Sequence, residues 1–110
     1  MNNFNIPQNI KKVVAFLFDH DESLLHSYFQ NDSMKPEYIF QEIKEYPGQL
    51  TFPPEIAFSD YEELPIDCNN IIVWFNLWFD DRKSDLIFEM RLTKDEKNNI
   101  QINVQGLRVM

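Results

Sequence analysis

Few residues of this 110-residue chain have types and spacings suited to nucleophilic or metal chemistry. Its two histidines, His20 and His26, are six positions apart, a spacing that puts them on opposite sides of a helix and argues against a shared metal ion. The single cysteine, Cys68, excludes an internal disulfide and a cysteine-rich zinc site. No Gly-x-Ser-x-Gly motif is present. We therefore predict a protein that is not an enzyme, with no catalytic residue, no metal site and no cofactor.

Carboxylates are plentiful, but their spacing fits no established carboxylate site. Asp19-x-Asp21-x-Ser23 matches the first three ligand positions of a calcium loop, but Leu24 stands where that loop needs glycine and Gln30 where it needs glutamate. We expect these acids to cap helix ends instead. Acid–base pairs could come from residues 60–67, but nothing in the sequence places them in an apolar pocket that would separate their pKa values.

The negative charge of the chain is concentrated in its middle. The formal net charge is −8, from 18 acidic and 10 basic residues. The acidic window, Asp19–Asp67, holds twelve acids against two bases, a net of −10, and the remainder holds six acids against eight bases, a net of +2. Because this field repels phosphate groups and anionic lipids, we expect no nucleic-acid partner and no membrane partner. It would attract a basic protein.

The length predicts one domain over residues 1–110. Apolar residues recur every three or four positions over 6–18, 24–29 and 36–46, which predicts two or three helices. We interpret 55–58 as a short edge strand and 60–67 as an ordered surface loop. Apolar residues then alternate or run together over 71–79, 86–92 and 100–109, and Gly106 interrupts the last run as a bulge would. The fold class is therefore α+β: two or three N-terminal helices packed on a curved antiparallel sheet that ends in a C-terminal three-stranded meander.

Two tryptophans raise a question that the sequence leaves open. The strand expected over 71–79 is apolar on both faces, with Trp74 and Trp78 on one of them. They either pack in the core beneath helices or point outward as part of an interface, where tryptophan often dominates the binding energy.

The same segment carries a family resemblance. Trp74-Phe75-Asn76-Leu77-Trp78, a polar turn, and then Ser84-Asp85-Leu86 with alternating apolar residues are similar to the end of small bacterial domains associated with contact-dependent growth inhibition and other polymorphic toxin systems. The resemblance covers 71–110. It implies an immunity protein, which is cytoplasmic and neutralises one cognate toxin domain, often a basic nuclease, by binding it.

An acidic segment could occupy the phosphate-binding site of such a toxin, with an aromatic anchor that excludes water. The residues that we expect to bind the partner are Asp60, Tyr61, Glu62, Glu63 and Asp67, followed by Asp19, Asp21 and Glu22. The alternative is a small-molecule-binding or enzymatic α+β domain of the cone-shaped kind. Its pocket would lie between helices and sheet, with His26, Tyr28 and Trp74 in the lining. The oligomeric state is not predicted.

Overall fold

The computed structural model of the chain describes residues 4–21, 23 and 36–109. The elements follow one another as α1 (Ile6–Phe18), α3 (Pro36–Glu45), the 3-10 helix η1 (Glu55–Ser59), β1 (Glu62–Asp67), β2 (Asn70–Phe79), β3 (Arg82–Lys94) and β4 (Ile100–Val109). The short helix expected over 24–29 lies outside the described residues.

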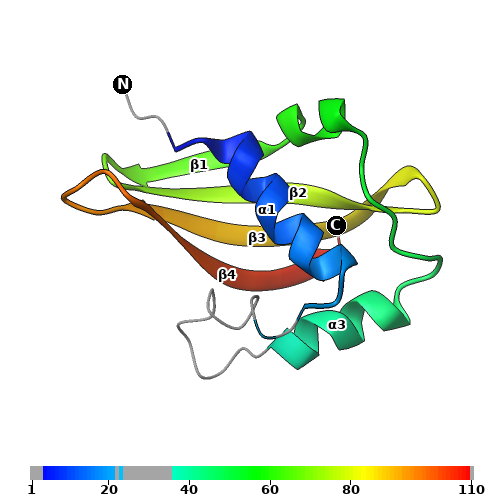
Figure 1. Cartoon of the computed structure of the whole chain (residues 1–110). Coiled ribbons are helices and arrows are strands. Elements are labelled where there is room, and N and C mark those ends of the chain that lie inside the picture. The colour runs from blue at the N-terminus through cyan, green and yellow to red at the C-terminus, as the bar shows by residue number, and fades with distance from the viewer. Residues whose placement is uncertain (1–3, 22, 24–35, 110) are drawn as a thin grey trace.

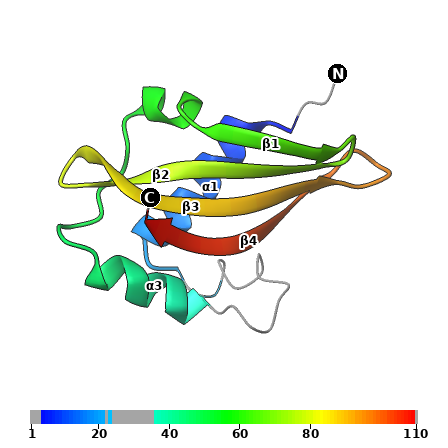
Figure 2. The same cartoon turned by 180° about the vertical axis from the view of Figure 1, so that it is seen from behind.

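The four strands form one antiparallel sheet in the order β1-β2-β3-β4, so each strand pairs with its neighbour in the sequence. Helix α1 lies across one face of this sheet, and α3 lies beside β4 (Figure 1). Seen from behind, the opposite face carries no described helix (Figure 2). We call it the outer face. The predicted α+β class, with helices and an antiparallel sheet, is confirmed.

The core lies between α1 and the inner face of the sheet. Ile10, Val13 and Leu17 recur at helical spacing on α1 and are fully buried. Along β2 every second side chain is buried against them, and the intervening ones are half-buried on the outer face. From η1, Phe58 stacks on Phe75 of β2 with ring centroids 5.6 Å apart. Burial of each such side chain stabilises the fold by about 1.5–3 kcal/mol, which fixes α1 and η1 on the sheet.

Two interpretations of the middle segment are wrong. The expected loop over 60–67 is mostly the strand β1, which pairs with β2 through Glu62 opposite Trp74 and Leu64 opposite Ile72. All six residues of β1 are exposed, so no alternation of apolar side chains marks it, and backbone pairing alone defines the strand. The expected strand over 55–58 is the 3-10 helix η1, in which the adjacent residues Ala57 and Phe58 are both buried.

The β2–β3 turn is shorter than the interval between the strands expected over 71–79 and 86–92, because β3 already begins at Arg82. Asp80 and Asp81 connect β2 and β3 with positive φ angles of 52° and 60°, as a two-residue hairpin turn of type I′ requires. In β4, Gly106 pairs with Glu89 while Val104 pairs with Met90, so Gln105 is an extra residue. The predicted bulge at Gly106 is therefore confirmed.

Candidate functional site

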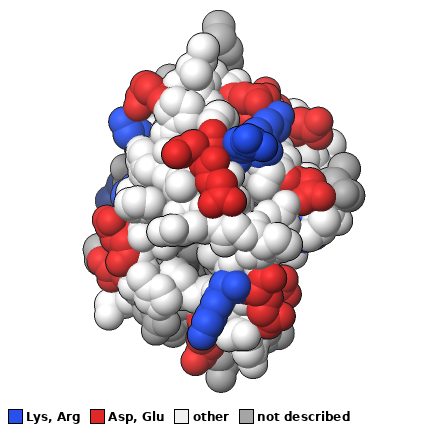
Figure 3. All heavy atoms as spheres, turned by 90° about the vertical axis from the view of Figure 1, so that its right-hand side faces the viewer, with Lys and Arg blue, Asp and Glu red and all other residues white. Residues whose placement is uncertain are grey.

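The acidic window does not form one surface. Helix α3 carries Glu37, Glu42 and Glu45 beside β4, whereas Glu62, Glu63 and Asp67 lie on β1, at the opposite edge of the sheet. Figure 3 shows the consequence at the right-hand end of Figure 1, where acidic side chains occur in separate groups with uncharged surface between them. Acidic residues that lie in one window of the sequence are therefore separated in the folded chain.

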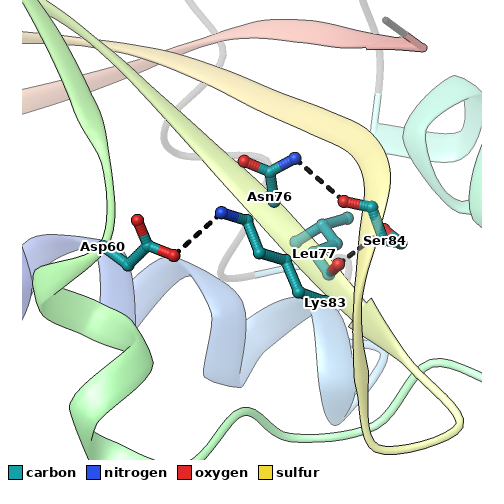
Figure 4. Close-up of polar contacts among 5 residues, drawn as sticks. All are labelled: Asp60, Asn76, Leu77, Lys83 and Ser84. Carbon is teal, nitrogen blue, oxygen red and sulfur yellow. Dashed lines mark hydrogen bonds and ion pairs between the residues drawn. The ribbon is translucent and has the colours of Figure 1, made fainter.

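Asp60 follows η1, and its charge is compensated. Lys83 extends from β3 and places its Nζ 2.9 Å from Asp60 Oδ2 (Figure 4). In the same region, Asn76 Nδ2 donates to the carbonyl oxygen of Ser84 at 2.9 Å, and Ser84 Oγ donates to the carbonyl oxygen of Leu77 at 2.5 Å. These bonds satisfy backbone groups where the β2–β3 register shifts. The ion pair is exposed, so it contributes under about 1 kcal/mol to folding.

The next three predicted residues differ in their surroundings. Glu62 is paired with Trp74 and shares the outer face, whereas Glu63 is paired with Val73 and lines a hollow of about 190 Å³ on the side of α1. Tyr61 packs partly against the core. Burial, followed by the negative charge of Glu63, raises the pKa of its phenol. Tyr61 is therefore a packing residue more than an exposed anchor.

Asp67 closes the β1–β2 turn. Its carboxylate accepts hydrogen bonds from Asn70 Nδ2 at 2.9 Å and from the backbone N–H of Asn69 at 2.8 Å. These bonds, with that from Asn70 the larger contribution, lower the pKa of Asp67. The carboxylate of Asp67 therefore accepts its hydrogen bonds from within the β1–β2 turn.

The secondary group of predicted residues lies at the end of α1. Asp19 directly follows the helix, and its backbone N–H donates to the carbonyl of Ala15 at 2.9 Å. The backbone N–H of Asp21 donates to the carbonyl of Phe16 at 2.9 Å. The backbone of both residues thus terminates α1. Glu22 lies outside the described residues.

Next to Asp19 lies a surface that the sequence analysis missed. Phe18 and Phe52 are 47% and 38% exposed, and their rings meet edge to face with centroids 5.8 Å apart. Phe52 also contacts Phe58 of η1 at 5.7 Å, and Ile56 of η1 is 81% exposed. We call Phe18, Phe52 and Ile56 the apolar patch. Large apolar side chains exposed together in this way are typical of interaction surfaces.

Carboxylates adjoin the residues of this patch along the chain. Asp19 adjoins Phe18, and Glu55 adjoins Ile56 and forms an ion pair with Lys11 of α1 at 2.8 Å. The β2–β3 turn is fastened to the segment before Phe52, because the backbone N–H of Asp81 donates to Thr51 Oγ1 at 3.0 Å. We call Asp19, Glu55, Asp80 and Asp81 the acidic rim, because Asp19 and Glu55 adjoin patch residues in the sequence and the turn that holds Asp80 and Asp81 is bonded to Thr51, next to Phe52. An apolar centre with a polar rim is the usual anatomy of a protein–protein interface.

A hollow of about 520 Å³ adjoins the patch, between the end of α1 and α3. Its lining includes Phe18, Phe40, Leu50, His20 and Lys44. The ring of His20 stacks on that of Phe40 with centroids 4.0 Å apart. This hollow continues the apolar surface from Phe18 toward α3.

The sequence signal for the patch was present but weak. Phe18 belongs to the apolar periodicity of 6–18, yet it is half-exposed at the last position of α1. Phe52 directly precedes Pro53-Pro54, and a residue before proline is held in extended backbone while the prolines themselves exclude regular pairing. An aromatic side chain at such a position has no partner strand to cover it.

The two tryptophans have different environments. Trp74 lies on the outer face, where its Nε1 donates to Glu89 Oε1 at 2.5 Å. Arg108 lies over its ring, 5.3 Å from the centroid, and 3.5 Å from Glu89. Trp78 is half-buried and packs partly against the core. Trp74 therefore does not line a pocket between helices and sheet, as the small-molecule alternative required, and the other two residues of that lining, His26 and Tyr28, lie outside the described residues.

Within residues 4–21, 23 and 36–109, no group of three or more His, Cys, Asp or Glu side chains is placed to hold a metal ion. Cys68 is exposed at the β1–β2 turn. None of the helices in this part of the chain is both long enough and apolar enough to cross a membrane.

Comparison with known proteins gives one match. The model of a family described as a domain of unknown function, DUF7668, matches residues 13–110, which extend from the middle of α1 to the C-terminal residue. No curated protein and no solved structure shows significant similarity to the chain.

Proposed function

This chain belongs to the DUF7668 family, and we propose that it is an immunity protein that neutralises a basic toxin domain in the cytoplasm by binding it one to one. The observation that carries the proposal is the apolar patch of Phe18, Phe52 and Ile56 within its acidic rim. The resemblance of the C-terminal strands to domains of toxin systems points in the same direction.

The chemistry of the patch suits a nuclease-type toxin. A site built to hold phosphate presents Lys, Arg and His side chains, and these would pair with Asp19, Asp80 and Asp81 through charge-assisted hydrogen bonds. Phe52 and Ile56 would cover the neighbouring surface and exclude water, which strengthens those pairs. Bound in this way, the inhibitor would block access of the phosphate backbone to the toxin.

The net negative charge of the chain would speed its association with a basic toxin. With a net charge of −8, the chain attracts a basic partner over distances up to the Debye length, about 8–10 Å at physiological salt. Such steering raises association rates by about 10–1000-fold at low ionic strength. The separate acidic groups need not all touch the partner for this effect.

The test is binding of the purified full chain to the C-terminal domain of the protein encoded by the neighbouring gene, measured by isothermal titration calorimetry. We expect one-to-one binding that Ile56→Asp weakens by about 30-fold or more, the effect of losing about 2 kcal/mol at an interface anchor. Ile56 is 81% exposed, so its replacement should leave the fold intact. Tyr38→Asp, at an exposed position on α3, is the matched control and should bind normally.

Absence of binding to that domain, with the fold intact by circular dichroism, would refute the proposed partner. Equal binding by Ile56→Asp, Phe52→Ser and the unmodified chain would refute the proposed surface. A loss caused equally by Tyr38→Asp would show that α3, instead of the patch, faces the toxin.

One observation favours the small-molecule alternative. The hollow between α1 and α3, at about 520 Å³, falls in the size range of ligand pockets, about 300–1000 Å³, and holds both a histidine and a lysine. A small anion that raises the melting temperature of the chain, but not of Lys44→Met, would support this function. If Ile56→Asp bound the anion as well as the unmodified chain does, the anion site would be distinct from the toxin-binding surface.

A further inference from the structure

The outer face of the sheet combines an apolar strip with balanced charges, and we infer that it pairs with the same face of a second copy to form a symmetric dimer. This inference does not depend on the proposed function, because the apolar patch comprises residues of α1, η1 and the segment between α3 and η1. The outer face comprises side chains of the strands, and no described helix lies on it (Figure 2).

An apolar strip crosses β1 and β2 on this face. Leu64 and Ile66 of β1 are 48% and 50% exposed, and Leu64 is paired with Ile72 of β2. Trp74, two positions further along β2, is half-buried on the same face. These side chains remain accessible in the isolated chain, so a second surface that covered them would gain hydrophobic stabilisation.

The charges of this face balance, unlike those of the chain as a whole. On the strands, the acids Glu62 and Glu89 lie with the bases Lys83, Arg91 and Arg108, and Lys83 is paired with Asp60 at the end of η1, so the net charge is zero, while the whole chain carries −8. Two copies of an acidic protein repel each other wherever like charges meet. A neutral face is where they can approach at the lowest electrostatic cost, whereas a basic toxin gains nothing from it.

The arrangement of these charges is also self-complementary. Asp60 pairs with Lys83, and Glu89 with Arg108, within one chain. Glu62 has no ion pair with another described residue, and Arg91 donates from Nε to the neutral Asn70 Oδ1 at 3.3 Å.

Symmetry can join the two remaining charges. Glu62 lies on β1 opposite Trp74, and Arg91 lies on β3 opposite Ile72, so the point midway between them falls on β2, between Trp74 and Ile72. A two-fold axis that runs parallel to the sheet through this point, perpendicular to the line joining Glu62 and Arg91, places Glu62 of each copy against Arg91 of the other, and does so twice. Because the axis passes between Ile72 and Trp74, it also brings the β2 strands of the two copies together.

The face is large enough for such a contact. Four strands about 4.8 Å apart and ten residues long at about 3.3 Å per residue give a flat footprint of roughly 600 Å². A standard interface buries about 800 Å² of accessible surface on each partner, and a pleated face with side chains exposes more than its flat footprint.

The test is sedimentation equilibrium of the full chain over a range of concentrations. We expect a concentration-dependent dimer, a tenfold or greater weakening of its dissociation constant in Glu62→Arg and in Arg91→Glu, and recovery in the double variant that exchanges the two charges. Lys97→Glu, which makes the same charge change as Arg91→Glu but in the exposed β3–β4 turn, is the control and should dimerise normally. Emission of Trp74 in a Trp78→Phe background should shift to the blue as the dimer forms.

A chain that stays monomeric at millimolar concentration would overturn the inference. So would a dimer that both single variants leave unchanged, or a double variant that remains monomeric, since a different contact would then be responsible. Should Arg91→Glu unfold, Glu62→Arg decides the matter because Glu62 is exposed on an edge strand. Normal dimerisation of Ile56→Asp would show that this surface and the toxin-binding surface are separate.

Discussion

Replacement of Gly48 by alanine is expected to destabilise the junction that leads into Phe52. Gly48 has a φ of 102°, a conformation that L-residues rarely adopt. A Cβ at this position would lie 2.7 Å from Asp80 Oδ2 and 3.5 Å from Phe79 Cβ. The backbone strain alone costs about 1–3 kcal/mol. The carboxylate of Asp80 must also move away from the added methyl group.

That movement has a cost of its own. Asp80 Oδ1 accepts a hydrogen bond from the backbone N–H of Gln49 at 3.1 Å, and loss of such an exposed bond costs about 1 kcal/mol. The two contributions together lower the free energy of unfolding by about 2–4 kcal/mol. For a domain of this size, that corresponds to a decrease in melting temperature of about 9–17 °C.

Thermal and urea unfolding of four proteins would measure both contributions: the unmodified chain, Gly48→Ala, Asp80→Gly and the double variant. In the Asp80→Gly background the contact with the carboxylate is absent, so Gly48→Ala should cost only the backbone part. An equal cost in both backgrounds would show that Asp80 does not contact the new methyl group. A cost below about 0.5 kcal/mol would refute the assigned backbone conformation as well.

Three further predictions concern single features. Asp67→Asn should flatten the pH dependence of the unfolding free energy below about pH 4. The pKa of Asp67 is lowered in the folded state, so its stabilisation is present above the unfolded-state value of about 3.9 and is lost as the pH falls through the folded-state pKa. Urea unfolding of both proteins at several pH values would detect this difference. Glu62→Lys with Glu63→Lys should slow association with a basic partner and reduce its salt dependence in stopped-flow measurements, and an unchanged rate would exclude β1 from steering. Trp78→Ala should lower the free energy of unfolding by about 2 kcal/mol, below the roughly 3–5 kcal/mol of a fully buried tryptophan, because the side chain is half-buried.

The parts of the fold that followed from the sequence are those in which burial leaves a periodic pattern. Ile10, Val13 and Leu17 mark α1 because they face the sheet, and the alternate apolar residues of 86–92 mark β3 because one face of the sheet is buried. β1 left no such trace, since every one of its side chains is exposed and its pairing uses backbone groups that carry no sequence information. The absence of a buried face therefore explains why the strand β1 was expected to be a loop.

The candidate site was harder to predict from the sequence for a related reason. Charge can be counted along a chain, but the side of the sheet on which each acid lies depends on tertiary contacts. Glu42 and Glu62 belong to one acidic window and lie at opposite edges of the sheet. The apolar patch depends on the ring contact between Phe18 and Phe52, which are 34 positions apart. No local pattern of residues predicts such a contact.

The composition of β1 also limits how the molecule can assemble. A strand at the border of a sheet offers unpaired backbone groups that can recruit further strands and seed fibrils. Here that border carries Glu62, Glu63 and Asp67, whose charges oppose a second acidic strand, and Pro65, which has no N–H to donate. Growth by strand addition along β1 is thereby discouraged, whichever face of the sheet engages a partner.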